Sequence, residues 1–209
     1  MVEDQLRARG IGDERVLAAM ARVPRELFVS PELRAHAYED DALPIGHDQS
    51  ISQPYMVARI CAGLALRGKE KVLDVGTGSG YQAAVLAELA GEVHSIERIP
   101  ELADRARAAL DAAGYAGRVH VHVGDGTKGL PEVAPFAAIA VAAAAPELPN
   151  SLYEQLELRG RLVVPVGGRR QQMLQVIVRT LEGPAVLRAV ACRFVPLLGA
   201  EGFAQHPLG

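Results

Sequence analysis

Three glycines, Gly76, Gly78 and Gly80, follow directly on the apolar run 72–75, and a helical pattern begins near Tyr81. Glycine allows positive φ angles and lets a ligand approach the main chain without a Cβ in the way. Dinucleotide sites use the spacing G-x-G-x-x-G, which would need a glycine at position 81, so a diphosphate ligand is not required here. The segment predicts a nucleotide-like cofactor at a strand–turn–helix unit. The competing interpretation is a glycine-rich connection in an unrelated α/β domain.

Three predicted strands carry a carboxylate at or near their carboxyl ends. Glu97 ends the run 93–97, where such an acid accepts hydrogen bonds from a ribose diol. Asp125 follows the third strand and could accept a hydrogen bond from an exocyclic amine such as adenine N6, although a plain turn explains Gly-Asp-Gly equally well. Asp74 lies inside an apolar strand, where burial costs free energy unless glycine-turn amides or a ligand cation bind it. A purely structural brace for the turn is the alternative role of Asp74.

The segments around these residues alternate between strand and helix patterns, which is typical of a doubly wound, mainly parallel sheet covered on both faces. We expect strands at 71–75, 93–97, 118–123, 136–142 and 161–166, and helices at 79–90, 100–113 and 147–157. The continuously apolar strands suit central positions, whereas the alternation in 118–123 suits an edge. Such sheets bind ligands beyond the carboxyl ends of their strands, so the glycines and the three acids should meet there.

We expect a single domain over residues 1–209. Residues 1–66 should form N-terminal helices, with Asp13 and Ser30 as helix caps, a long polar loop over 41–55 and a helix at 56–66. Residues 67–198 should hold the cofactor-binding core and a C-terminal β-hairpin that turns at 182–184. Residues 199–209 should form a frayed tail.

The composition excludes several classes of protein. The chain has 22 basic and 25 acidic residues among 209, which gives no electrostatic footprint for nucleic acid or an anionic membrane. Two cysteines are too few for a disulfide framework, and His120 and His122 have no third ligand nearby, so a solvated strand edge is favoured over a metal site. No apolar run reaches the length of a membrane span. We therefore expect a cytoplasmic monomer without a metal, a membrane contact or a nucleic-acid partner.

Six segments resemble, in the same order, motifs of the protein-L-isoaspartate O-methyltransferase family, which uses S-adenosylmethionine to repair damaged aspartyl sites in proteins. The resemblance runs from about residue 4 to residue 198, and its segments are Ile51-Ser52-Gln53-Pro54-Tyr55-Met56, Leu73 to Tyr81, Ile96-Glu97-Arg98, Gly124-Asp125-Gly126, Ala143-Ala144-Ala145-Pro146 and Arg193-Phe194-Val195-Pro196-Leu197. It implies a Rossmann-like S-adenosylmethionine-dependent methyltransferase fold, with isoaspartyl-containing proteins and peptides as partners.

The resemblance also implies roles for particular residues. Ser52 would occupy the catalytic position. The residues that hold the cofactor would be Asp74, Gly76, Thr77, Gly78, Ser79, Gly80, Glu97, Arg98, Gly124, Asp125 and Gly126. The residues that border the peptide substrate would be Ile51, Ser52, Gln53, Phe194, Val195 and Pro196.

In that family a methyl group passes from a sulfonium to the free α-carboxylate of an L-isoaspartyl residue. A carboxylate with a pKa near 4 is ionised at pH 7, so no general base is needed. Ser52 could donate its hydroxyl to one carboxylate oxygen and leave the other aimed at the methyl group, although a loop hydroxyl that closes a local turn is the alternative. The following backbone nitrogen then displaces the ester to form a succinimide, whose hydrolysis returns part of the material to normal aspartate.

One departure from the family and three other functions remain open. Family members commonly carry Phe-Asp where this chain has Phe136-Ala137, which puts the anchoring of that strand in doubt. Ala140 and Ala142 put in doubt the shape of the pocket floor. A nucleic-acid methyltransferase would share the cofactor half, but the chain lacks its second proline after Gln53-Pro54. A small-molecule methyltransferase or a binding module without turnover is the other alternative.

Overall fold

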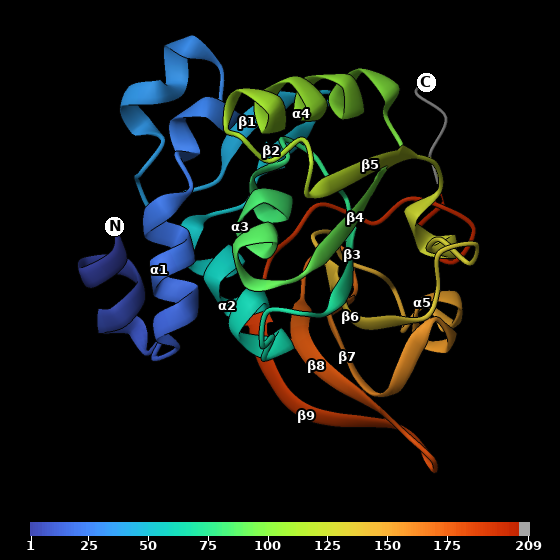
Figure 1. Cartoon of the computed structure of the whole chain (residues 1–209). Helices are drawn as coiled ribbons and strands as arrows, with labels where there is room; N and C mark the ends of the chain where they lie inside the picture. The colour runs from blue at the N-terminus through green and yellow to red at the C-terminus, as the bar shows by residue number, and fades with distance from the viewer. Residues whose placement is uncertain (205–209) are drawn as a thin grey trace.

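The computed structural model describes residues 1–204, and within them one sheet of seven strands carries helices on both faces (Figure 1). The strands are β3 (Lys71–Val75), β4 (Glu92–Glu97), β5 (Val119–Val123), β6 (Phe136–Val141), β7 (Leu156–Gly167), β8 (Gln172–Thr180) and β9 (Gly183–Cys192). Their order is β5-β4-β3-β6-β7-β8-β9. The strands from β5 to β7 are parallel, and β8 and β9 are antiparallel. The structure thus confirms the predicted fold class, the edge position of β5 and the C-terminal hairpin.

Two apolar cores lie on opposite faces of this sheet because its central strands are apolar on both sides. The helices are α1 (Glu14–Arg22), α2 (Pro54–Leu64), α3 (Tyr81–Leu89), α4 (Pro100–Ala112) and α5 (Asn150–Glu154). The larger core joins α1 to α4 with the sheet through side chains such as Val72, Leu86 and Val163. The smaller core joins α5 and the segment before β6 with Leu73, Ile139 and other alternate residues of the same strands.

The N-terminal region is built from α1 and short helical turns, η1 (Val2–Leu6), η2 (Arg7–Arg9), η3 (Arg25–Phe28) and η4 (Pro31–His36). Asp13 caps α1 as predicted, because its carboxylate accepts from the backbone N–H groups of Arg15 and Val16. Ser30 precedes η4 with Pro31 at its first position, but its hydroxyl makes no capping hydrogen bond. The expected capping role therefore holds for Asp13 and not for the Ser30 side chain.

The segment expected to be a long polar loop contains a small hairpin of β1 (Leu43–Gly46) and β2 (Gln49–Ile51). Its turn places His47 and Asp48 at positive φ of 53° and 56°, a conformation that short polar side chains tolerate better than most. Arg105 on α4 donates to the carbonyl of Ile45 and ties the hairpin to the body of the protein. The prediction of a loop was wrong because the turn pairs two strands that are too short to show a period in the sequence.

Two other boundaries differ from the sequence expectations. α5 spans only Asn150–Glu154 instead of 147–157, because Pro149 precedes it and β7 already begins at Leu156. Residues 199–204 do not fray: the backbone N–H groups of Ala200 and Glu201 donate to Asp125 Oδ2 at 2.9 Å and Thr127 Oγ1 at 3.1 Å. The rest of the expected tail, 205–209, lies outside the described residues.

Among residues 1–204, no helix has both the length and the apolar content that crossing a bilayer requires.

Candidate active site

The glycine turn lies between β3 and α3 and takes the backbone conformation that its composition predicts. Gly76, Gly78 and Gly80 have φ angles of 90°, 54° and 91°, which other residues rarely adopt. The N–H of Gly76 donates to the carbonyl of Ile96 on β4 at 2.9 Å, which fixes the turn against the neighbouring strand. The turn therefore exposes main chain to a ligand at the carboxyl edge of the sheet.

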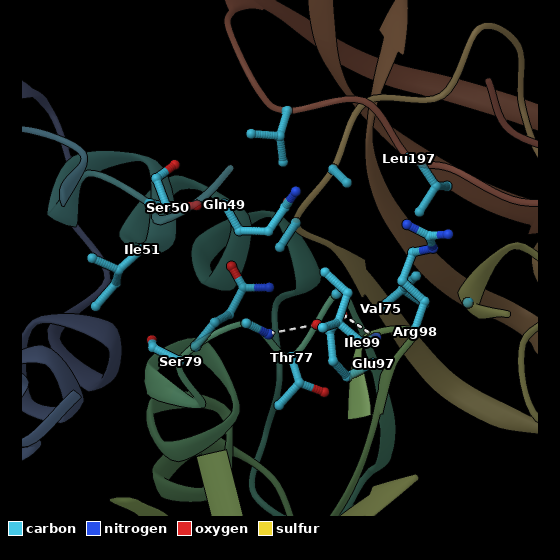
Figure 2. Close-up of a pocket in the computed structure, with 18 of the residues that line it drawn as sticks. Gln49, Ser50, Ile51, Val75, Thr77, Ser79, Glu97, Arg98, Ile99 and Leu197 are labelled. Atoms are coloured by element: carbon cyan, nitrogen blue, oxygen red, sulfur yellow. Dashed lines mark hydrogen bonds between the residues drawn. The ribbon is translucent and has the colours of Figure 1, made fainter. Parts of the chain in front are cut away.

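Glu97 binds this turn directly. Its Oε2 accepts from the N–H of Gly78 at 2.9 Å, and its Oε1 accepts from the N–H of Ile99 at 3.0 Å. Figure 2 shows Glu97 between Thr77 and Ile99 on one side of the cavity, with these bonds as dashed lines. Each carboxylate oxygen has a second lone pair, so Glu97 can hold the turn and still accept hydrogen bonds from a diol.

Asp74 is fully buried and does not contact the glycine-turn amides. Its Oδ1 accepts from Nε2 of Gln82 at 2.7 Å, and its Oδ2 accepts from Oγ of Ser95 at 2.8 Å. Ser95 in turn shares a 2.6 Å hydrogen bond with the hydroxyl of Thr77. Burial raises the pKa of Asp74 to about 6, and the two hydrogen bonds oppose that rise. Asp74 thus braces the turn through Ser95 and Thr77.

Asp125 faces the chain segment that follows β9. Its Oδ1 accepts from the N–H of Thr127 at 2.9 Å, and its Oδ2 accepts from the N–H of Ala200. Burial acts to raise the pKa of this carboxyl, but these hydrogen bonds outweigh it and leave the pKa below its usual value. The role of Asp125 toward an adenine amine stays a prediction; Gly126, the next residue, lines the cavity.

The cavity beside the glycine turn has a volume of about 800 Å³, part of it open to solvent, which is in the size range of small-molecule sites. Of the residues expected to hold a cofactor, those that line it are Gly76, Thr77, Gly78, Ser79, Glu97, Arg98 and Gly126. Asp74, Gly80, Gly124 and Asp125 lie outside the lining. The hairpin residues Gln49, Ser50 and Ile51 lie across the cavity from Glu97 (Figure 2).

A second cleft of about 1240 Å³, also open to solvent, adjoins this cavity. Five residues line both spaces: Ser50, Ser52, Ala142, Val195 and Pro196. Gln53 and Phe194 line only the second cleft, and Ile51 lines only the first. The residues expected to border a peptide therefore gather between the two spaces.

Ser52 is half-buried at this boundary, and its hydroxyl makes no hydrogen bond within residues 1–204. It therefore does not close a local turn, which was the alternative to a substrate role. Asp40 orders the Ser52 loop, because its carboxylate accepts from Gln53 Nε2 at 2.8 Å and from the N–H of Tyr55 at 3.3 Å. The sequence gave no sign of this role for Asp40.

Other lining residues were also missed from the sequence, and they are Gln49, Ser50, Val57, Gln82, Ala142, Leu197 and Leu198. Ala142 lines both spaces at the end of β6. The replacement Ala137 leaves that strand well anchored: Phe136 is fully buried, and its N–H donates to the carbonyl of Gln155 at 2.8 Å. Within the described part of the chain, no group of His, Cys, Asp and Glu is arranged to hold a metal ion.

The fold and the cavity at the carboxyl ends of the strands are those of the S-adenosylmethionine-dependent methyltransferases. A Plasmodium falciparum protein-L-isoaspartate O-methyltransferase in complex with S-adenosyl-L-homocysteine is similar to this chain with a TM-score of 0.80 and 26% identity, over 94% of this chain and 96% of that one. A second solved protein-L-isoaspartate O-methyltransferase has a TM-score of 0.82 at 26% identity, over 96% of this chain and 67% of that one.

Sequence comparisons define the family within this class. The model of the family protein-L-isoaspartate(D-aspartate) O-methyltransferase matches residues 1–202, so the chain belongs to that family. A protein-L-isoaspartate O-methyltransferase 2 of Marinobacter nauticus is 57% identical over 97% of this chain and 93% of its own length. A protein-L-isoaspartate O-methyltransferase of Methanoculleus marisnigri is 54% identical over 97% of this chain and 92% of its own length.

Proposed function

We propose that this protein transfers a methyl group from S-adenosylmethionine to the free α-carboxylate of L-isoaspartyl residues in damaged proteins and peptides. Methylation starts repair, because the ester is a good leaving group for closure of a succinimide. The observation that carries this proposal is the placement of Ser52 between a cofactor-sized cavity and an open cleft. The family of the chain supports the same activity.

The residues around the cavity fit the cofactor. Gln82 lines the cavity and has a buried amide oxygen without a partner, so an acceptor awaits a ligand donor there. The turn at Gly76 and Gly78 leaves main chain uncovered, and Glu97 has free lone pairs for the ribose hydroxyls. When bound, the cofactor supplies an activated methyl group on a sulfonium. The roles that we propose for Thr77, Ser79 and the other predicted cofactor residues remain contacts to this molecule.

The task of the protein is to position an acceptor that is already ionised at pH 7. Correct placement of two reactants can lower a barrier by about 7–11 kcal/mol. We propose that the Ser52 hydroxyl donates to one oxygen of the acceptor carboxylate and aims the other oxygen at the cavity. A hydrogen bond to a charged acceptor contributes about 1.5–3 kcal/mol.

The cleft beyond Ser52 suits an anionic peptide. It is lined by Arg169 and Arg193 as well as by Asp41, and both arginines are exposed at the described surface. Two guanidinium groups against one carboxylate favour an incoming anion over a cation. Phe194 and Met56 supply apolar area for the peptide main chain and its side chains.

The test is transfer of labelled methyl from S-adenosylmethionine to paired peptides that differ only in isoaspartate against aspartate. We expect label in the isoaspartyl peptide and none above background in the aspartyl peptide. Equal labelling of the two peptides, or labelling of neither while S-adenosylhomocysteine still binds, would overturn the proposed substrate. Labelling of nucleic acid or of a small carboxylic acid at a higher rate would favour the alternative acceptors.

We also propose that the protein acts as a cytoplasmic monomer. The free state of Cys61 and Cys192 supports a reducing compartment, and the small net charge supports a partner other than nucleic acid. Light scattering coupled to gel filtration tests the monomer, for which we expect a mass near 22.2 kDa.

A further inference from the structure

Gln82 presents an unusual amide to the cofactor cavity. The residue lies in the first turn of α3, is 6% exposed and lines the cavity beside the glycine turn. Its Nε2 donates to Asp74 Oδ1 at 2.7 Å, while its Oε1 is buried without a hydrogen-bond partner within residues 1–204. A buried carbonyl oxygen without a partner costs about 1–3 kcal/mol, so this atom calls for a donor.

Asp74 fixes the orientation of this amide. An ionised carboxylate only accepts hydrogen bonds, so the NH2 group of Gln82 must face Asp74 and the oxygen must face the other way. The second oxygen of Asp74 is bound by Ser95, a residue behind the cavity lining. Both partners are neutral, so the buried charge of Asp74 has no counter-ion among its hydrogen-bond partners. A cation near Gln82 would compensate that charge.

The donor groups of S-adenosylmethionine are its adenine amine, its ribose hydroxyls and its ammonium. Glu97 is proposed to take the ribose, and Gly126, beyond the neighbouring strand β5, lies on the adenine side. The ammonium is the one cationic donor of the three. We propose that Gln82 Oε1 accepts a hydrogen bond from this ammonium, with Asp74 behind it as the residue that orients the amide and supplies negative potential. This inference rests on the cofactor and on the ribose role of Glu97, not on the identity of the methyl acceptor.

The experiment compares two ligands that differ only in the amino group. S-Adenosylhomocysteine has it, and 5′-S-(3-carboxypropyl)-5′-thioadenosine lacks it. We expect calorimetry at pH 7.5 to show that the wild type binds the first ligand about 10- to 100-fold more tightly, the factor expected for one hydrogen bond from a charged group. Equal affinities for the two ligands would overturn the proposal without any variant.

Variants then assign the preference to Gln82. In Gln82→Leu, which has a similar volume and no acceptor, the preference for the amine should shrink to less than threefold, while the deaminated ligand keeps its wild-type affinity. Ser95→Ala is the matched control, because it removes the other partner of Asp74 from outside the cavity lining and should keep the preference. Gln82→Met serves if the leucine variant does not fold. A preference that survives in the Gln82 variants, or equal weakening of both ligands, would overturn the assignment.

The pH dependence supplies a second readout. A bound ammonium favours the ionised form of Asp74, so the affinity for S-adenosylhomocysteine should fall as the pH is lowered through about 6, where burial has placed the pKa of this carboxyl. The deaminated ligand should lose less affinity over the same range. The same pH profile for both ligands would argue against a charge interaction. Loss of activity toward isoaspartyl peptides would leave all three measurements unaffected, so the two proposals can fail separately.

Discussion

Glu97→Gln separates the structural and ligand-binding roles that meet in one carboxylate. The wild-type oxygens accept from the N–H groups of Gly78 at 2.9 Å and Ile99 at 3.0 Å. The amide of glutamine keeps one acceptor and places an NH2 group against the other N–H. One hydrogen bond to a charged acceptor is therefore lost, and we expect the free energy of unfolding to fall by about 1.5–3 kcal/mol.

The same substitution should weaken the cofactor. The remaining oxygen is neutral and must serve both the turn and the ribose, so we expect the Kd for S-adenosylhomocysteine to rise about 10- to 100-fold, which corresponds to about 1.4–2.8 kcal/mol. Calorimetry measures the Kd, and urea denaturation measures the stability. The amine preference attributed to Gln82 should persist, because the methionine end of the ligand is untouched.

Glu92→Gln is the matched control, since Glu92 begins the strand that Glu97 ends and its side chain is half exposed. We expect it to leave the Kd within twofold of the wild type. If Glu97→Gln lowers the stability but leaves the Kd unchanged, Glu97 is only a brace for the turn. If it changes neither, the inferred geometry is refuted.

Three further predictions concern other parts of the protein. Ser52→Ala should lower kcat/KM for an isoaspartyl peptide about 10- to 100-fold in methyl-transfer assays and leave the Kd for S-adenosylhomocysteine within twofold, whereas Ser52→Thr should retain activity; parallel loss of both would reassign the residue. Gly199→Ala would place a Cβ 2.1 Å from Asp125 Oδ1, so urea denaturation should show a loss of about 1–3 kcal/mol, and an unchanged midpoint would contradict the docking of residues 199–204. Burial lowers the pKa of His94, so the folded state binds fewer protons than the unfolded state below pH 6.5 and the free energy of unfolding should fall as the pH drops from 7.5 to 5.5. His94→Asn should flatten this dependence, and identical slopes for variant and wild type would exclude His94 as its source.

Much of the sheet was predictable because its signals are local. Continuous apolar runs marked β3, β6 and β7 as central strands, and alternation in 118–123 marked β5 as an edge. The glycine turn was predictable for the same reason, since only glycine adopts its φ angles readily. The β1–β2 hairpin was not, because three or four residues carry no clear period and its pairing depends on contacts with α4.

The candidate site was predictable in its residues but not in their partners. The sequence marked Asp74 as a buried acid and left open what binds it, and the structure supplies Gln82 and Ser95. Both partners are distant in sequence from Asp74 and come from two different elements, so no spacing rule connects them. Asp40 was missed for a similar reason, because it contacts Gln53 across 13 residues of chain.

The shared boundary formed by Ser50, Ser52 and Pro196 has a kinetic consequence. Donor and acceptor occupy two spaces, each with its own opening to solvent, so neither has to leave before the other arrives. The geometry therefore favours a ternary complex with direct transfer over a route in which the enzyme itself carries the methyl group. A methylated product can dissociate while the spent donor is still in place.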